Sequence, residues 1–248
     1  MSLTDRDLLN SLLILSTAIT EMIELEAQVM AKRHKSKDLL VARKEYLSFW
    51  LRTQSFFITA KALTDQEPFE DFYNRNISKD WRLGIKAMRN LFSHEVKLIP
   101  SVYSFVRFIP EESVSISLKG FTISVDNANI LLRECIEREI KRELNRKKKK
   151  LLSDNQRQQK FDVGILTLNC WKSKSDPKVV FITDIATQHY MKIYNLLSVL
   201  RADNKVIVSE SEQPDSGIIP LKDKLLLIDT TVVQVKEYRA NKFMRDII

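Results

Sequence analysis

The 248-residue sequence predicts a mainly helical α+β protein, and three observations lead to this fold class. Four glycines and six prolines are too few for a turn-rich β-sandwich or barrel. No glycine or proline precedes Pro68, so the first quarter of the chain has no strong break. After Pro100 the composition changes to Val, Ile, Phe, Tyr and Ser, which is typical of strands. We expect an antiparallel helical bundle with a small β insertion, followed by a smaller mixed α/β region.

Two long helices are expected first, packed antiparallel because their connection is short. The first starts after Thr4, a favourable N-cap, and its apolar residues recur at helical spacing. These residues are Leu8, Leu12, Leu15, Ile19, Met22 and Val29. The second helix is expected over Leu39 to Leu63. Its expected buried residues are Leu47, Trp50, Leu51, Phe57 and Ile58.

Two shorter helices and a β insertion at about residues 98–126 follow. A short helix is expected from Pro68 to Asn74, and Ser78 is expected to cap a helix that runs to Ser93. The segments richest in strand formers are 101–109, 113–118 and 121–125. Pro110 and Gly120 separate them, and Lys119-Gly120 is expected in a hairpin turn.

The remaining chain is divided into the end of a first domain, residues 1–152, and a C-terminal α/β region, residues 153–248. Asp126 or Asn127 is expected to cap a long helix that ends in a lysine-rich run. Periodicity leaves Phe161 to Trp171 open as a strand or a buried helix. Thr187 to Leu200 is expected to be helical, whereas 229–233 suits a strand as well as a helix opened by Pro220.

Charge and cysteine content limit the class of protein. The net charge of +8 favours a polyanionic partner such as nucleic acid. Cys135 and Cys170 cannot form a disulfide framework and offer no paired zinc spacing, so a reducing, cytoplasmic location is expected. The apolar stretch from Leu8 to Ile19 is too short and too polar to span a bilayer, so no membrane association is expected.

The segment from Trp81 to His94 contains the candidate catalytic residues. Its apolar residues Trp81, Ile85, Met88 and Phe92 share one helical face. The basic residues Arg82, Lys86 and Arg89 share another face, and His94 stands at the end of the segment. Arg89, Asn90 and His94 form the pattern Arg-Asn-xxx-His, which resembles the ribonuclease motif of the HEPN superfamily. The resemblance covers six residues as a motif and about residues 1–152 as a helix pattern.

The resemblance implies an endoribonuclease that needs no metal or other cofactor. Arg89 and His94 would be catalytic and Asn90 supporting, with the 2′-hydroxyl of RNA as the nucleophile. On an unbroken helix Arg89 and His94 lie about 140° apart, and family members commonly pair two copies of the motif, so a homodimer with a composite site is expected. The family also implies toxin activity or phage defence, with an antitoxin or other regulatory partner as a candidate.

Further basic residues are candidates for RNA binding: Arg82, Lys86, Lys147, Lys148, Lys149 and Lys150. The lysine run also suits a solvated helix end, where cations interact favourably with the helix dipole. Likewise, His94 could cap its helix while Arg89 pairs with Glu95 or Glu70. The alternative function is therefore a non-catalytic HEPN-like module for RNA binding or dimerisation.

Overall fold

The computed structural model describes residues 5–32, 39–66, 69–94, 101–109, 114–130, 133–134, 137, 179–202 and 221–245. The helices are α1 (Asp5–Lys32), α2 (Leu39–Thr64), α3 (Phe69–Asn76), α4 (Lys79–His94), α7 (Ile182–Ala202) and α8 (Leu221–Arg245). The strands are β1 (Ser101–Ile109), β2 (Val114–Ser124) and β3 (Val179–Phe181). The predicted mainly helical fold with a small antiparallel sheet is confirmed.

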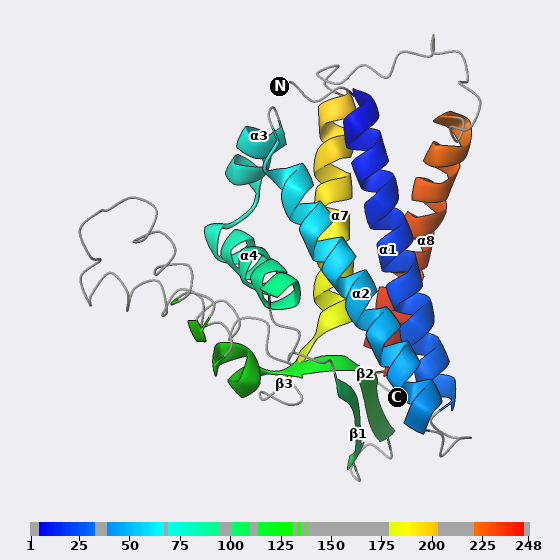
Figure 1. Ribbon diagram of the computed structural model, residues 1–248. Coiled ribbons are helices and arrows are strands. Elements are labelled where there is room, and N and C mark those ends of the chain that lie inside the picture. The colour runs from blue at the N-terminus through cyan, green and yellow to red at the C-terminus, as the bar shows by residue number, and fades with distance from the viewer. Residues whose placement is uncertain are drawn as a thin grey trace.

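Four long helices form the body of the molecule, and α1 contacts each of the other three, α2, α7 and α8. Figure 1 shows these helices running alongside one another, with the sheet across one end of the bundle. Helix α4 packs against α2 on the side away from α8, and α3 connects α2 to α4. The candidate motif therefore lies on a helix at the flank of the bundle.

The apolar stripe expected on the first helix is confirmed. All six of its residues are buried: Leu8, Leu12, Leu15, Ile19, Met22 and Val29. They belong to one hydrophobic core that also contains Ile185, Tyr190 and Ile193 of α7 and Val232 and Val235 of α8. Because these helices share a core with α1, the described part of residues 153–248 completes the bundle. The boundary at 152/153 and the lysines Lys147 to Lys150 lie outside the described residues.

The buried face expected for the second helix is wrong in part. Phe57 is buried and Trp50 is half-buried, but Leu47, Leu51 and Ile58 are 58%, 49% and 42% exposed. Phe49 and Phe56 take the core positions instead. Phe49 stacks on Phe121 of β2 with 3.8 Å between ring centroids, and Phe57 stacks on Phe92 of α4 at 5.9 Å. The aromatic side of α2 is buried because it meets both the sheet and α4.

The three strands form an antiparallel sheet in the order β1-β2-β3. The β insertion is confirmed, but the expected turn at Lys119-Gly120 is wrong because β2 runs through both residues. Tyr103 pairs with Gly120 in mid-strand. A Cβ atom at Gly120 would stand 3.0 Å from Oε1 of Glu26 and 3.0 Å from Cδ1 of Phe181. This glycine allows a side chain of α1 and a ring of β3 to approach β2 closely, and close approach is the other common reason for glycine in a strand.

The chain after the hairpin shows three differences in detail. The helix after β2 begins at Val125, and Ser124 rather than Asp126 or Asn127 caps it, with Asn127 N donating to Ser124 Oγ at 3.4 Å. Strand β3 was not expected, and it continues directly into α7. The residues 229–233 are helical within α8, which resolves that alternative. The Phe161 to Trp171 segment lies outside the described residues.

A buried carboxylate, Glu26 of α1, joins the bundle to the sheet. It accepts hydrogen bonds from Phe121 N of β2 at 3.2 Å and from Thr183 Oγ1 of α7 at 2.5 Å. Tyr238 OH of α8 donates to Glu26 Oε1 at 2.8 Å and lies 3.2 Å from Asp184 Oδ1. Burial, followed by the charges of Glu26 and Asp184, raises the pKa of Tyr238. One carboxylate thus connects four elements, and such satisfied buried networks favour a single arrangement of the elements.

Helix α1 is long and apolar enough, from Leu8 to Ala31, to cross a membrane by length and composition alone. The stretch that the sequence indicated as too short and too polar to span a bilayer ends at Ile19, whereas the apolar part of the helix extends to Ala31. Within this stretch, 44% of the most apolar 18-residue window is buried, and α1 contacts α2, α7 and α8. A helix in the core of a helical bundle can be equally long and apolar, so these two properties do not indicate a membrane span by themselves.

Candidate functional site

Helix α4 carries the candidate motif, and its start and its inner face agree with the sequence prediction. Ser78 caps the helix, with Trp81 N donating to Ser78 Oγ at 3.4 Å. Ile85, Met88 and Phe92 are buried against the bundle, and Trp81 is partly buried beside them. This apolar face fixes the rotation of α4, so the basic residues of the helix are directed away from the core.

Arg89 and Asn90 contact each other directly. Nη1 of Arg89 donates a hydrogen bond to Oδ1 of Asn90 at 2.8 Å, and both residues are half-buried. The amide is neutral, so it orients the guanidinium without cancelling its charge. Among the described residues Arg89 forms no ion pair, and Glu70 is not its partner. Glu95, the other carboxylate considered for Arg89, lies outside the described residues.

His94 is the last residue of α4, and the helix continues without a break through Ser93. Its side chain lies outside the described part of the structure. An unbroken helix places the Cα–Cβ directions of Arg89 and His94 about 140° apart, whereas Asn90 and His94 are i,i+4 neighbours. The local break near Ser93 that would let one subunit aim both residues at the same phosphate is therefore absent from the backbone of α4.

The other predicted RNA-binding residues of α4 differ in their surroundings. Arg82 Nε donates to the backbone oxygen of Ile77 at 3.1 Å, and Arg82 Nη1 donates to Asn74 Oδ1 at 2.5 Å. Arg82 therefore holds the end of α3 against α4. Lys86 is exposed. The structure brings Arg89 and Asn90 together and leaves Lys86 free to reach a ligand.

A contact that the sequence analysis missed anchors α4 to α7. Trp81 Nε1 donates to Nδ1 of His189 at 3.1 Å, and Nζ of Lys192 lies 5.1 Å from the Trp81 ring centroid. His189 is fully buried, and burial followed by the charge of Lys192 lowers its pKa to about 3. Its Nε2 is buried without a hydrogen-bond partner among the described residues. The helical spacing of His189 from Ala186 and Ile193, both buried, would have indicated a buried histidine.

The described residues contain no group of three or more His, Cys, Asp or Glu side chains that could hold a metal ion. Comparisons of the chain with protein-family models, with curated proteins and with solved structures found no match.

Proposed function

We propose that the protein is a metal-independent endoribonuclease of HEPN type, with Arg89 and His94 as catalytic residues and Asn90 as their support. The observation that carries the proposal is the Arg89–Asn90 hydrogen bond, one helical turn before His94. The guanidinium is oriented by a neutral amide and keeps its full charge. A fixed, permanently charged donor is suited to a phosphate group that gains negative charge in a transition state.

The proposed reaction uses only RNA and the protein side chains. A base removes the proton of a 2′-hydroxyl, whose oxygen forms a bond to the adjacent phosphorus. The bond from phosphorus to the 5′-oxygen breaks, and an acid supplies the proton which that oxygen needs. His94 serves as base or acid because imidazole titrates near neutral pH. The products are a 2′,3′-cyclic phosphate and a 5′-hydroxyl, and Arg89 stabilises the charge on the phosphate oxygens.

The proposal includes a homodimer with a composite site. Because α4 is unbroken up to His94, one subunit does not readily direct both Arg89 and His94 to the same phosphate. A second copy would supply the missing residue. The exposed leucine–isoleucine stripe of α2, formed by Leu47, Leu51 and Ile58, is the candidate contact surface. It lies on the helix that packs directly against α4.

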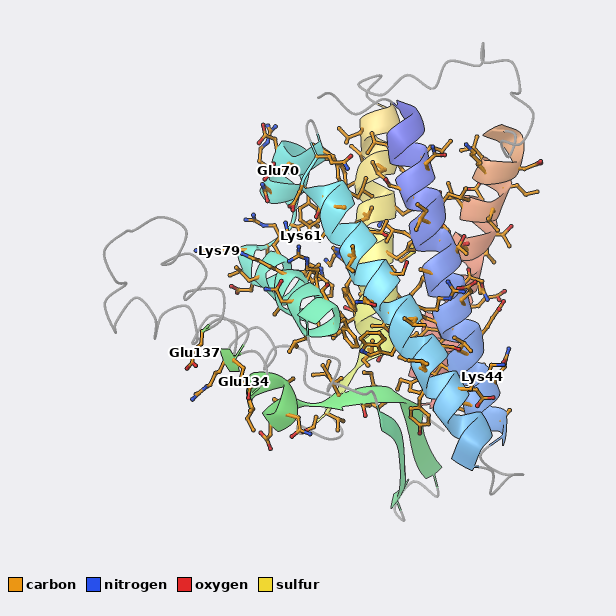
Figure 2. All side chains as sticks on the ribbon, in the orientation of Figure 1. Lys44, Lys61, Glu70, Lys79, Glu134 and Glu137 are labelled. Atoms are coloured by element: carbon orange, nitrogen blue, oxygen red, sulfur yellow. The ribbon has the colours of Figure 1, made fainter. Side chains whose placement is uncertain are left out.

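The test is cleavage of a mixed RNA pool in EDTA by the wild type and by Arg89→Ala and His94→Ala. We expect cutting by the wild type, with 2′,3′-cyclic phosphate ends, and a loss of at least about 100-fold in each variant. Lys44→Ala is the control, since Lys44 is exposed near the lower end of α2 in Figure 2. Equal cutting by all four proteins would contradict the assignment of these residues, and RNA binding without cutting would favour the non-catalytic module.

A further inference from the structure

We infer that the outer face of α4 binds four successive phosphates of a single-stranded RNA through Lys79, Arg82, Lys86 and Arg89. These four residues are called the α4 cationic stripe below. The inference deepens the proposed function and rests on it for the choice of a single strand. Lys79 joins the residues already considered because the structure begins α4 at this lysine and leaves it exposed.

The four residues form a straight row. Their spacing of three, four and three residues keeps them within about 80° of one another around the helix and distributes them over about 15 Å of its length. Lys79 and Lys86 are exposed, and Arg82 and Arg89 are half-buried. Figure 2 shows Lys79 at the left-hand end of α4, directed away from the bundle. A row of this kind follows the backbone of a polyanion and leads to Arg89 at its end.

The charge of the row is not neutralised within the described residues. Arg82 and Arg89 donate to the neutral oxygens of Asn74 and Asn90, and no member of the stripe forms an ion pair there. The single acid of α4, Asp80, lies about 140° around the helix from the centre of the stripe. Four cations without acidic partners attract phosphates and release the counterions of the nucleic acid on binding.

The stripe has no free aromatic platform beside it among the described residues of α4. The Trp81 ring has Lys192 Nζ at 5.1 Å and the His189 ring at 6.3 Å, and its Nε1 is used by His189. Base stacking, which supplies much of the affinity in other single-strand binders, therefore has no free ring at this helix. Recognition along the stripe is recognition of the backbone, with little preference among bases.

The proposed reaction selects a single strand. Attack by a 2′-oxygen requires that oxygen, the phosphorus and the 5′-oxygen to lie in line. Regular A-form stacking prevents this alignment, whereas a flexible strand reaches it. A strand held at four phosphates along α4 remains free to rotate the nucleotide next to Arg89.

The test measures the binding of a labelled 12-nucleotide oligo(U) strand to protein carrying His94→Ala, which keeps the probe intact. Four phosphate contacts predict a slope of log affinity against log salt of about −2.8 for a single strand. In Lys79→Gln/Lys86→Gln the expected slope is about −1.4, because two of the contacts are lost. Arg82 is left unchanged since it also holds α3. An oligo(A) strand should give the same slopes.

The control Lys44→Gln/Lys236→Gln removes the same two charges from exposed positions on α2 and α8 and should keep the full slope. An equal slope of log affinity against log salt in the two double variants would contradict the proposed binding of phosphates by the α4 cationic stripe. Preference for a 12-base-pair duplex, or for phosphatidylserine vesicles, with the same dependence on Lys79 and Lys86 would overturn the single-strand assignment. If cleavage in EDTA is absent but the slopes follow expectation, the proposed reaction fails and the phosphate-binding stripe stands.

Discussion

Two arginines of α4 hold an asparagine in similar ways but with different consequences for the fold. Arg82 bonds to Asn74 and to the backbone of Ile77, so it connects two helices. Arg89 bonds to the adjacent Asn90 on its own helix, so this bond connects no separate elements. A hydrogen bond that orients a charged side chain but links no separate elements contributes little to the fold. Such a bond is better explained by a role in binding a ligand. Arg89 is therefore the residue of α4 on which the functional proposal rests.

His189 makes the stability of the protein depend on pH. Its pKa is lowered to about 3 in the folded protein, against an ordinary value of 6.5. As the pH falls below 6.5 the unfolded chain takes up a proton that the folded protein does not accept until about pH 3. Stability is therefore lost over this window, and the loss due to His189 between pH 7 and pH 5 is about 2 kcal/mol.

Urea unfolding of the wild type and of His189→Asn at both pH values checks this. Asparagine keeps an acceptor for Trp81 Nε1 but does not titrate, so its stability should fall less between pH 7 and pH 5 than that of the wild type. Its absolute stability can be lower because the ring is lost, and only the difference between the two pH values decides. An equal fall in both proteins would contradict a buried neutral His189.

At the scale of single elements, sequence periodicity predicted where the helices lie in the chain better than it predicted which side of each helix is buried. The six residues predicted for the apolar stripe of α1 are all buried, although Ala18 and Ile23, which were not predicted, are buried as well. Helix α2 is apolar on two sides, so its pattern fits two rotations. Contacts of Phe49 with Phe121 and of Phe57 with Phe92 select one of them. Those contacts come from elements distant in the chain, which local periodicity does not include.

The exposed stripe of α2 leads to a prediction about assembly. Leu51→Arg should raise the dissociation constant of the proposed homodimer on the order of 100-fold, because an unpaired guanidinium would be buried in the interface. The free energy of unfolding of the monomer should change by less than about 0.5 kcal/mol, since Leu51 is exposed. Sedimentation equilibrium measures the first quantity and urea unfolding the second.

Leu226→Arg is the matched control, because Leu226 is an exposed leucine on α8. It should leave the dissociation constant unchanged. A chain that is monomeric as the wild type, or a Leu226→Arg variant that dissociates while Leu51→Arg does not, would remove α2 as the contact surface.

At the scale of the whole molecule, the bundle depends on residues from both ends of the chain. Leu15, Ile19 and Met22 of α1 share their core with helices that begin at Ile182 and Leu221. Residues 1–152 alone should therefore not unfold cooperatively, because a large part of the α1 surface would be exposed to water. Circular dichroism during thermal unfolding tests this against the full chain. A cooperative transition in residues 1–152 would contradict the shared core.

Only the part of the candidate site whose residues are close together in the sequence could be predicted. Arg89, Asn90 and His94 stand within six residues, so the sequence shows their pattern directly. The contact of Trp81 with His189 joins residues 108 positions apart, and no local signal connects them. The role of Gly120 was mistaken for the same reason, since Glu26 and Phe181 determine it. Spacing along the chain shows which residues one helix carries, whereas distant packing determines what surrounds them.

The buried Glu26 also has a consequence for protein synthesis. Its hydrogen-bond partners follow it by 95, 157 and 212 residues. The last of these, Tyr238, is synthesised 212 residues after Glu26. During translation the N-terminal helices are made before the residues they pack against. Contacts between residues so far apart in the chain slow folding. Helix α4 is therefore synthesised well before the hydrogen bonds of Glu26 can form, and the bundle that positions α4 is complete only after α8 has been made.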